Sequence, residues 1–236
     1  MSELSFAKNE SPVRRGRWWE RLLLVAVFVA CLRLLPPLWC GRNAGDWWRG
    51  ESSRQVALAY GVARWTAGPL GPGEFKTGVG TFDGEWLFGT YQMAILGHAQ
   101  IGRQHPELLE RCLRRMEEAE DRLLGENVRA FDRREWKEDP LAGLNGPNGH
   151  AGYLGYFNVA LGVHRRLDAG FKHRDLNDRI TATLAKNLAA SPISLIETYP
   201  GQTFPVDNCA VAVSLRLHDL ADRTNRYEAV YRRWLG

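Results

Sequence analysis

The amino-acid sequence predicts an all-α protein in which one apolar helix near the N-terminus precedes a domain of repeated helical hairpins. Apolar residues recur at helical spacing along most of the chain. Segments rich in small and aromatic residues alternate with charged amphipathic ones, and only the short piece 193–198 has the composition of an extended strand. With 236 residues and 44% hydrophobic content, the chain is long enough for one sizeable core.

The apolar segment spans residues 22–39 and follows a basic tail, residues 1–21. It is interrupted by one charge, Arg33, and its length is near the minimum of about 17 residues that spans a bilayer. Basic residues before the segment favour a cytoplasmic N-terminus, and Trp18 and Trp39 lie where interfacial aromatic residues are expected. We therefore expect a single-pass membrane protein whose helical domain lies outside the cytoplasm.

Two other interpretations of this segment remain open. A cleaved signal peptide has a similar basic start and a short apolar core, here residues 22–31, although no clear small-x-small cleavage motif follows. A buried core helix is the third interpretation, because Arg33 and two prolines weaken a membrane span.

The net charge of +4 lies in the first 45 residues, which carry seven basic and three acidic side chains. The remainder is balanced, so a nucleic-acid-binding surface is not expected. The four cysteines lack the paired spacing of a zinc site, so no metal centre is predicted from them.

After a linker at 40–52, the domain at 53–236 begins with a candidate helix at 53–66. Three pairs follow, each consisting of an inner helix rich in small and aromatic residues and a polar outer helix. The pairs are 84–103 with 106–124, 151–168 with 174–190, and 208–223 with 227–235. Repeated hairpins of this kind are typical of an α/α toroid or solenoid, in which each hairpin buries its apolar face against the next.

One histidine lies near the end of each inner helix: His98, His164 and His218. A cation at that place interacts favourably with the last helical carbonyls, so the simplest role for these three residues is structural.

Three loops lead into the inner helices, and loops held by a rigid scaffold are where sites usually form. The loop at 81–86 contains Asp83, Glu85 and Trp86. Either acid could serve as a catalytic carboxylate, and Trp86 could contact a substrate. The alternative is that Asp83 caps the helix and Glu85 interacts with its dipole.

The second loop, 143–150, is polar, rich in glycine and ends at His150. A helix start disfavours a cation, so a neutral imidazole would be available there as a base.

The third loop, 197–208, contains Thr198 and Tyr199 and ends with Asp207 and Asn208. The last two could be a helix N-cap, but an acid, a tyrosine and an amide in one loop also suit a substrate pocket.

A series of these features resembles the linalool dehydratase/isomerase family, over roughly residues 84–235. The residues that carry the resemblance are Gly149-His150, the helix 174–190, Ser191-Pro192, Thr198-Tyr199-Pro200, Asp207-Asn208, Ser214-Leu215, and the segment from Arg226-Tyr227 to Trp234-Leu235. In that family a Gly-His pair opens an inner helix, and a loop with a Cys-Glu-Pro run precedes the next one.

The resemblance implies an α/α barrel that dehydrates or isomerises a small, largely apolar alcohol without a metal or an organic cofactor. His150 falls on the family's catalytic histidine, and Asp83 is the nearest match to its N-terminal aspartate. The family's two active-site cysteines fall on Thr198 and Asp207, so the proton relay must differ here. The family barrel has six hairpins and this sequence holds about three, so the resemblance also implies part of a barrel or one half of a two-chain assembly.

The first functional hypothesis is therefore a membrane-anchored lyase or isomerase. His150 and Asp207 would face one shared cavity and exchange protons with a bound alcohol or alkene, while Tyr199 or Asn208 orients it.

Two alternatives remain. A toroidal glycan-active hydrolase or epimerase would act on a polyol-like substrate with Asp83, Glu85 or Asp207 as paired carboxylates. A non-catalytic helical scaffold on the membrane surface would expose an apolar face, which a second copy or a complementing chain would cover.

Overall fold

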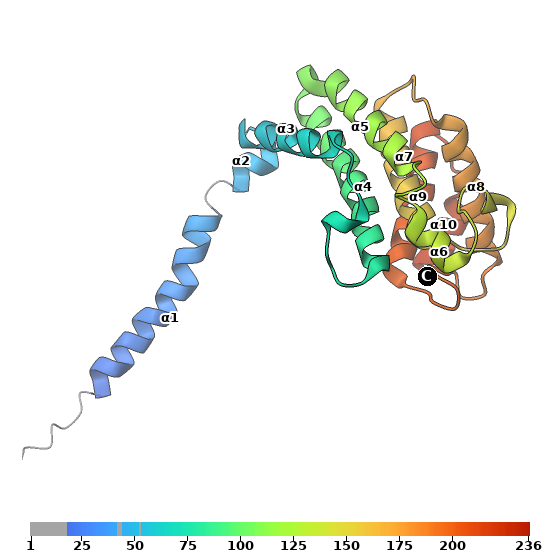
Figure 1. The fold of residues 1–236 in the computed structure, drawn as a ribbon. Coiled ribbons are helices and arrows are strands. Elements are labelled where there is room, and N and C mark those ends of the chain that lie inside the picture. The colour runs from blue at the N-terminus through green and yellow to red at the C-terminus, as the bar shows by residue number, and fades with distance from the viewer. Residues whose placement is uncertain (1–17, 42–43, 52) are drawn as a thin grey trace, which may run out of the picture. The chain divides into compact units, whose positions relative to one another are not determined.

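The computed structural model describes residues 18–41, 44–51 and 53–236. These residues form helices and connecting loops without a β-strand, which confirms the predicted all-α class (Figure 1). The expected extended piece at 193–198 forms no strand. The only β-type pairing in the described part of the chain is an isolated antiparallel bridge between Tyr199 and Gln202.

The chain divides into two compact units, residues 1–51 and 52–236. The first contains α1 (Trp18–Cys40) and α2 (Ala44–Arg49), and the basic tail at 1–17 lies outside the described residues. The expected apolar segment at 22–39 is thus helical and extends to 23 residues, or about 35 Å at 1.5 Å per residue.

Helix α1 is long and apolar enough to span a membrane. This statement rests on length and composition, which a signal sequence near an N-terminus shares. No residue of α1 is buried, so the core-helix interpretation is not supported within the described residues. Helix α2 lies in the segment expected to be a linker.

The second unit contains the three expected hairpins and the preceding helix α3 (Ser53–Ala67). The hairpins are α4 (Gly80–Gln104) with α5 (Leu109–Leu123), α7 (Tyr156–Leu167) with α8 (Arg174–Ala190), and α9 (Pro205–Asp222) with α10 (Glu228–Leu235). Short 3-10 turns cover η1 (Pro72–Glu74), η2 (Pro106–Leu108) and η3 (Gly143–Asn145). Two further elements precede α7: α6 (Ala130–Trp136) and the π-helical turn η4 (Ala151–Gly155).

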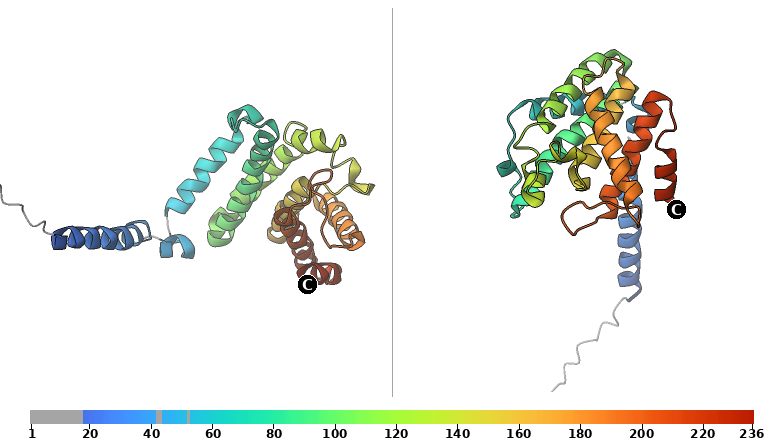
Figure 2. Two further views of the ribbon diagram at one scale, coloured as in Figure 1. Left: turned by 90° about the horizontal axis from the view of Figure 1, so that it is seen from below. Right: turned by 90° about the vertical axis from the view of Figure 1, so that its right-hand side faces the viewer.

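The inner helices pack in sequence, α4 against α7 and α7 against α9 (Figures 1 and 2). Helix α5 lies against α4 and α7, α8 against α7 and α9, and α10 against α9 and α8. This is the layering that the alternation of small-plus-aromatic and amphipathic segments predicts.

The core lies between these two layers. Its centre is an aromatic group in which the rings of Phe88 and Phe157 lie 5.2 Å and 5.6 Å from the ring of Tyr153. All three side chains are buried, and the Tyr153 hydroxyl donates to the Leu123 carbonyl at 2.9 Å. Helix α5 contributes a stripe at helical spacing, consisting of Cys112, Met116, Ala119 and Leu123.

Two inner helices begin earlier than the sequence predicts. Helix α4 begins at Gly80, with Val79 as its N-cap, and α9 begins at Pro205, whose missing N–H is not needed in a first helical turn. Neither Asp83 nor Asp207 is therefore an N-cap, and both are acids in a first turn, where the helix dipole favours negative charge.

Two of the three histidines have a structural role, as expected, but they fulfil it by pairing with an acid on another helix and not only by their place near a helix end. His164 Nδ1 contacts Glu120 Oε1 at 2.8 Å, and His218 Nε2 contacts Asp178 Oδ1 at 2.7 Å. Each of these buried rings joins two different helices, so it contributes to the packing of the layers.

Candidate functional site

His150 has the most unusual backbone position in the second unit. Its φ of 46° and ψ of 31° are left-handed, its side chain is fully buried, and the π-helical turn η4 begins directly after it. Left-handed conformations cost a non-glycine residue about 1–3 kcal/mol, and both such strain and π-turns are frequent at functional sites.

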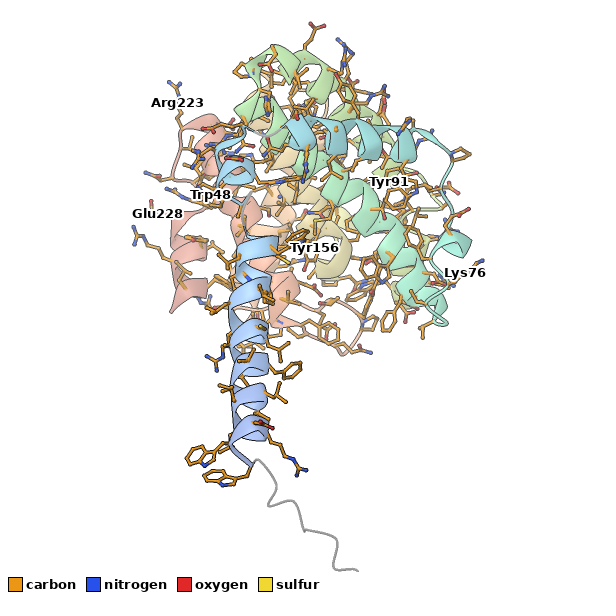
Figure 3. The ribbon with its side chains drawn as sticks, turned by 90° about the vertical axis from the view of Figure 1, so that its left-hand side faces the viewer. Trp48, Lys76, Tyr91, Tyr156, Arg223 and Glu228 are labelled. Atoms are coloured by element: carbon orange, nitrogen blue, oxygen red, sulfur yellow. The ribbon has the colours of Figure 1, made fainter. Side chains whose placement is uncertain are left out.

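The other non-glycine residues with positive φ are different. They lie on the surface or are half-buried, and two of them point outward in Figure 3, namely Lys76 and Arg223. The remaining two are Lys137 and Ser194. Among the described residues, His150 alone combines this conformation with complete burial, so the surrounding structure must hold it in place.

The loop at 197–208 holds His150 through its backbone neighbours. Ala151 N donates to the Glu197 carbonyl at 3.1 Å. On the other side, Gly149 approaches the same residue so closely that an added Cβ would lie 2.3 Å from the Glu197 carbonyl oxygen. The second and third candidate loops are thus in direct backbone contact, and glycine is required at 149 for that approach.

The imidazole of His150 is paired with Asp132, which lies on α6. His150 Nδ1 lies 2.6 Å from Asp132 Oδ2, and both side chains are fully buried. A carboxylate can only accept, so the hydrogen bond places a proton on Nδ1, and in the neutral tautomer with that proton Nε2 is the basic nitrogen. Burial raises the pKa of Asp132, although the hydrogen bond and the charge of His150 act in the opposite direction.

His150 Nε2 has no hydrogen-bond partner within the described chain. The acid that lies closest to Nε2 is Glu138, whose Oε2 is 3.6 Å away and accepts a hydrogen bond from Asn148 Nδ2 at 2.5 Å. The ring of Trp136 packs against the imidazole, with 4.6 Å between the ring centroids. An imidazole oriented by a carboxylate, with its second nitrogen unpartnered, has two of the features of a general base, and a substrate would have to reach Nε2 for it to act.

Asp207 is connected to the same region through Thr198. Trp136 Nε1 donates to the Thr198 carbonyl at 3.0 Å, and the Thr198 hydroxyl donates to Asp207 Oδ2 at 2.6 Å. Tyr156, in the first turn of α7, has its pKa raised to about 12 by burial and by the negative charge of Asp207. The Asp207 carboxylate therefore lies near the start of the second inner helix, and His150 precedes the same helix start.

Glu85 and Tyr199 form the third part of the cluster. The Tyr199 hydroxyl donates to Glu85 Oε1, which joins α4 to the loop at 197–208. Burial raises the pKa of Glu85, the Tyr199 hydrogen bond opposes that shift, and the charges of Asp207 and Glu135 add to it. Burial and the Glu85 carboxylate also raise the pKa of Tyr199. Glu85 thus retains a proton more readily than an ordinary carboxyl.

Three of the predicted site residues do not contribute a free side chain to this cluster: two bond backbone groups, and one lines a separate groove. Asp83 accepts from Thr77 N at 2.7 Å, which lowers its pKa and fixes the loop before α4. Trp86 is 60% exposed and lines a groove between α3 and α4. Asn208 is buried and bonds both backbone groups of Ile196, at 2.8 Å and 3.0 Å.

Neither Asp132 nor the pairing of Glu85 with Tyr199 could be predicted from a local sequence pattern. Asp132 lies in a short, charged segment, FDRREW, without a clear apolar face. Glu85 and Tyr199 are separated by 114 positions, and only the packing of α4 beside the third loop brings them together.

A group of potential metal ligands lies elsewhere in the second unit. Ligand atoms of Asp178, His218 and Asp222 all lie within 4.8 Å of one another, and no other such group occurs among the described residues. The Arg165 guanidinium donates to Asp178 at 2.5 Å and to Asp222 at 2.6 Å and 2.7 Å. The Arg165 guanidinium therefore already pairs with the two carboxylates that would attract a metal ion.

The chain matches no protein-family model, and no curated protein matches it. The resemblance to the linalool dehydratase/isomerase family thus rests on the sequence features quoted for it alone.

Proposed function

We propose that the domain at 53–236 is an acid/base lyase or isomerase of the linalool dehydratase/isomerase type, which acts on a small, largely apolar alcohol or alkene. The observation that carries this proposal is the buried pair of His150 and Asp132. In this pair, His150 has a left-handed backbone, its Nδ1 atom is held by the Asp132 carboxylate, and its Nε2 atom has no hydrogen-bond partner among the described residues.

The proposed step is an elimination of water. His150 Nε2 takes a proton from the carbon next to the carbinol carbon, and the electrons of that C–H bond form the new double bond. The C–O bond breaks, and the leaving hydroxyl takes a proton from a carboxylic acid and departs as water. The imidazolium then returns its proton to the carboxylate, and the reverse sequence hydrates an alkene.

Glu85 is the carboxylic acid that we assign to the leaving hydroxyl, because burial raises its pKa. Asp207 is held by Thr198 and contributes a second carboxylate at the same helix starts. The tyrosine hydroxyl of Tyr199, which is bonded to Glu85, orients the substrate oxygen. No metal or organic cofactor is part of this proposal.

A second candidate is a toroidal glycan-active hydrolase or epimerase with a polyol-like substrate. It is favoured by one observation: the carboxylates of Glu85 and Asp207 both raise the pKa of Tyr199, so the two acids lie within electrostatic reach of one hydroxyl. Asp83, the third acid of that hypothesis, already accepts a hydrogen bond from the backbone N–H of Thr77.

We further propose that the layers α4–α7–α9 and α5–α8–α10 are part of an α/α toroid, which a second copy or a complementing chain completes. Support comes from the consecutive packing of the inner helices and from apolar residues exposed along α9 at seven-residue spacing: Val206, Val213 and Leu220. We also propose that α1 crosses a membrane with the domain outside the cytoplasm, which the basic tail supports.

The full chain, purified in detergent, tests the catalytic proposal. Turnover of tertiary and allylic alcohols would be followed by gas chromatography, in the wild type and in His150→Ala. General-base removal typically costs about 10²–10⁴-fold in rate, so a loss of that size is expected.

Asp83→Asn is the matched control, because it alters an acid in the first turn of α4 that lies outside the cluster. It should retain activity. Equal activity in the wild type and His150→Ala would contradict the proposal, and turnover of glycosides instead of alcohols would support the second candidate.

A further inference from the structure

A groove lies between α3 and α4. Its volume is about 830 Å³, and its walls come from α3, η1 and α4. Small-molecule sites typically enclose roughly 300–1,000 Å³, so the groove has the size of a ligand site. None of His150, Asp132, Glu85, Tyr199 or Asp207 lines it.

The walls of the groove are apolar and unusually exposed. Trp86 is 60% exposed, Met93 64%, Leu58 57% and Trp65 53%, and all four line the groove. A contiguous exposed surface of large apolar side chains is uncommon on a soluble domain and marks a place where a ligand or partner binds.

Helix α3 buries few of its side chains, and α4 presents small residues to the groove. Gln55 is the only buried residue of α3, and its amide bonds Gln104 at 2.6 Å and His105 at 3.0 Å. On the facing side, α4 carries Gly89 and Gly97, and a Cβ added to either would meet nothing within 4 Å. These two glycines leave the floor of the groove open.

A buried histidine lines the groove. His98 is 4% exposed, its Nε2 has no hydrogen-bond partner within the described residues, and it lines both the groove and a second cavity of about 540 Å³. Burial lowers the pKa of His98, and the nearby charge of Arg115 lowers it further. The imidazole is thus neutral near pH 7 and suits an uncharged hydroxyl.

The charges around the groove are consistent with an uncharged ligand. Apart from the neutral His98, Glu74 is the only acidic or basic residue that lines it. A carboxylate headgroup would find no cation there, whereas a hydroxyl needs only one hydrogen-bond partner.

We propose that the α3–α4 groove binds one long-chain, lipid-like alcohol, with its apolar chain along Leu58, Trp65, Trp86 and Met93 and its hydroxyl on His98. This assignment of the ligand rests on the proposed membrane span of α1, which only residues 41–52 separate from α3 in the sequence, so that the bilayer is its source. The inference is independent of the proposed reaction.

Binding of radiolabelled 1-dodecanol to the full chain in phospholipid nanodiscs tests the proposal. The wild type should bind the alcohol saturably and prefer it to dodecanoate and to dodecane. Gly97→Phe fills the floor of the groove and should weaken binding about tenfold or more, which corresponds to about 1.4 kcal/mol. His98→Leu should remove the preference for dodecanol over dodecane.

Gly61→Phe is the matched control. Gly61 lies on α3, lines neither cavity, and has nothing within 4 Å of an added Cβ, so dodecanol binding should persist. His150→Ala should also bind normally, which separates this proposal from the reaction. Unchanged binding in Gly97→Phe would overturn the proposal, and so would a wild-type dimer that Gly97→Phe dissociates, because a second copy would then cover the groove.

Discussion

Replacing Gly149 with alanine tests how the candidate site is held together. An added Cβ would lie 2.3 Å, 2.8 Å and 3.1 Å from the O, N and C atoms of Glu197, and all three are backbone atoms that cannot rotate away. The two loops must therefore separate. Overpacking of this kind costs about 1–3 kcal/mol.

Separation also strains the hydrogen bond from Ala151 N to the Glu197 carbonyl, which contributes about 0.5–1.5 kcal/mol. Gly149→Ala should therefore lower the free energy of unfolding by about 2–4 kcal/mol. Because His150 is the next residue, activity should fall with stability.

Urea unfolding of the full chain in detergent, followed by circular dichroism, measures this change. Gly89→Ala is the control, since its Cβ meets nothing within 4 Å and alanine is the better helix former by about 0.8–1.0 kcal/mol. The two substitutions should change stability in opposite directions. A wild-type midpoint for Gly149→Ala would refute the close approach of the two loops.

Three further perturbations have defined outcomes. Burial raises the pKa of Glu120 from 4.5 to about 7, so the folded state holds a proton that the unfolded state has lost, and stability should fall as the pH rises from about 4.5 to 7. Thermal melts across that range should show this slope in the wild type but not in Glu120→Gln. Tyr199→Phe removes the hydrogen bond that opposes the upward pKa shift of Glu85, so the limb of the pH–rate profile that reports Glu85 should move to higher pH, and an unmoved limb would exclude Glu85 as the acid. Arg165→Met removes a buried guanidinium that bonds two partly exposed carboxylates, so it should destabilise the fold by about 1–3 kcal/mol in urea titrations. A change below about 0.5 kcal/mol would show that the network contributes little.

Helical periodicity predicted most of the fold, because each inner or outer helix is long enough to show its apolar pattern. The segment 174–190 was predicted with the observed bounds, and 53–66 differs from α3 by one residue. The starts of α4 and α9 were placed too late, because acids that look like caps, Asp83 and Asp207, lie inside the first turn.

The site was less predictable, because its contacts join residues that are distant in the sequence. His150 was identified from its place at the end of a glycine-rich loop. Its partner Asp132 lies on α6, a seven-residue helix whose short, charged sequence carries no periodic signal. The left-handed backbone of His150 also has no clear local signature, because glycine is the usual residue in that conformation and most histidines do not adopt it.

Proton exchange at carbon is the most direct test of the central claim, that His150 and Asp132 form the base of an acid/base enzyme. The full chain would be incubated in D₂O with tertiary and allylic alcohols, and the recovered alcohol and alkene would be examined by mass spectrometry. We predict deuterium on carbon with the wild type and none above background with His150→Ala. Equal deuterium in both samples, or none with the wild type, would contradict the account.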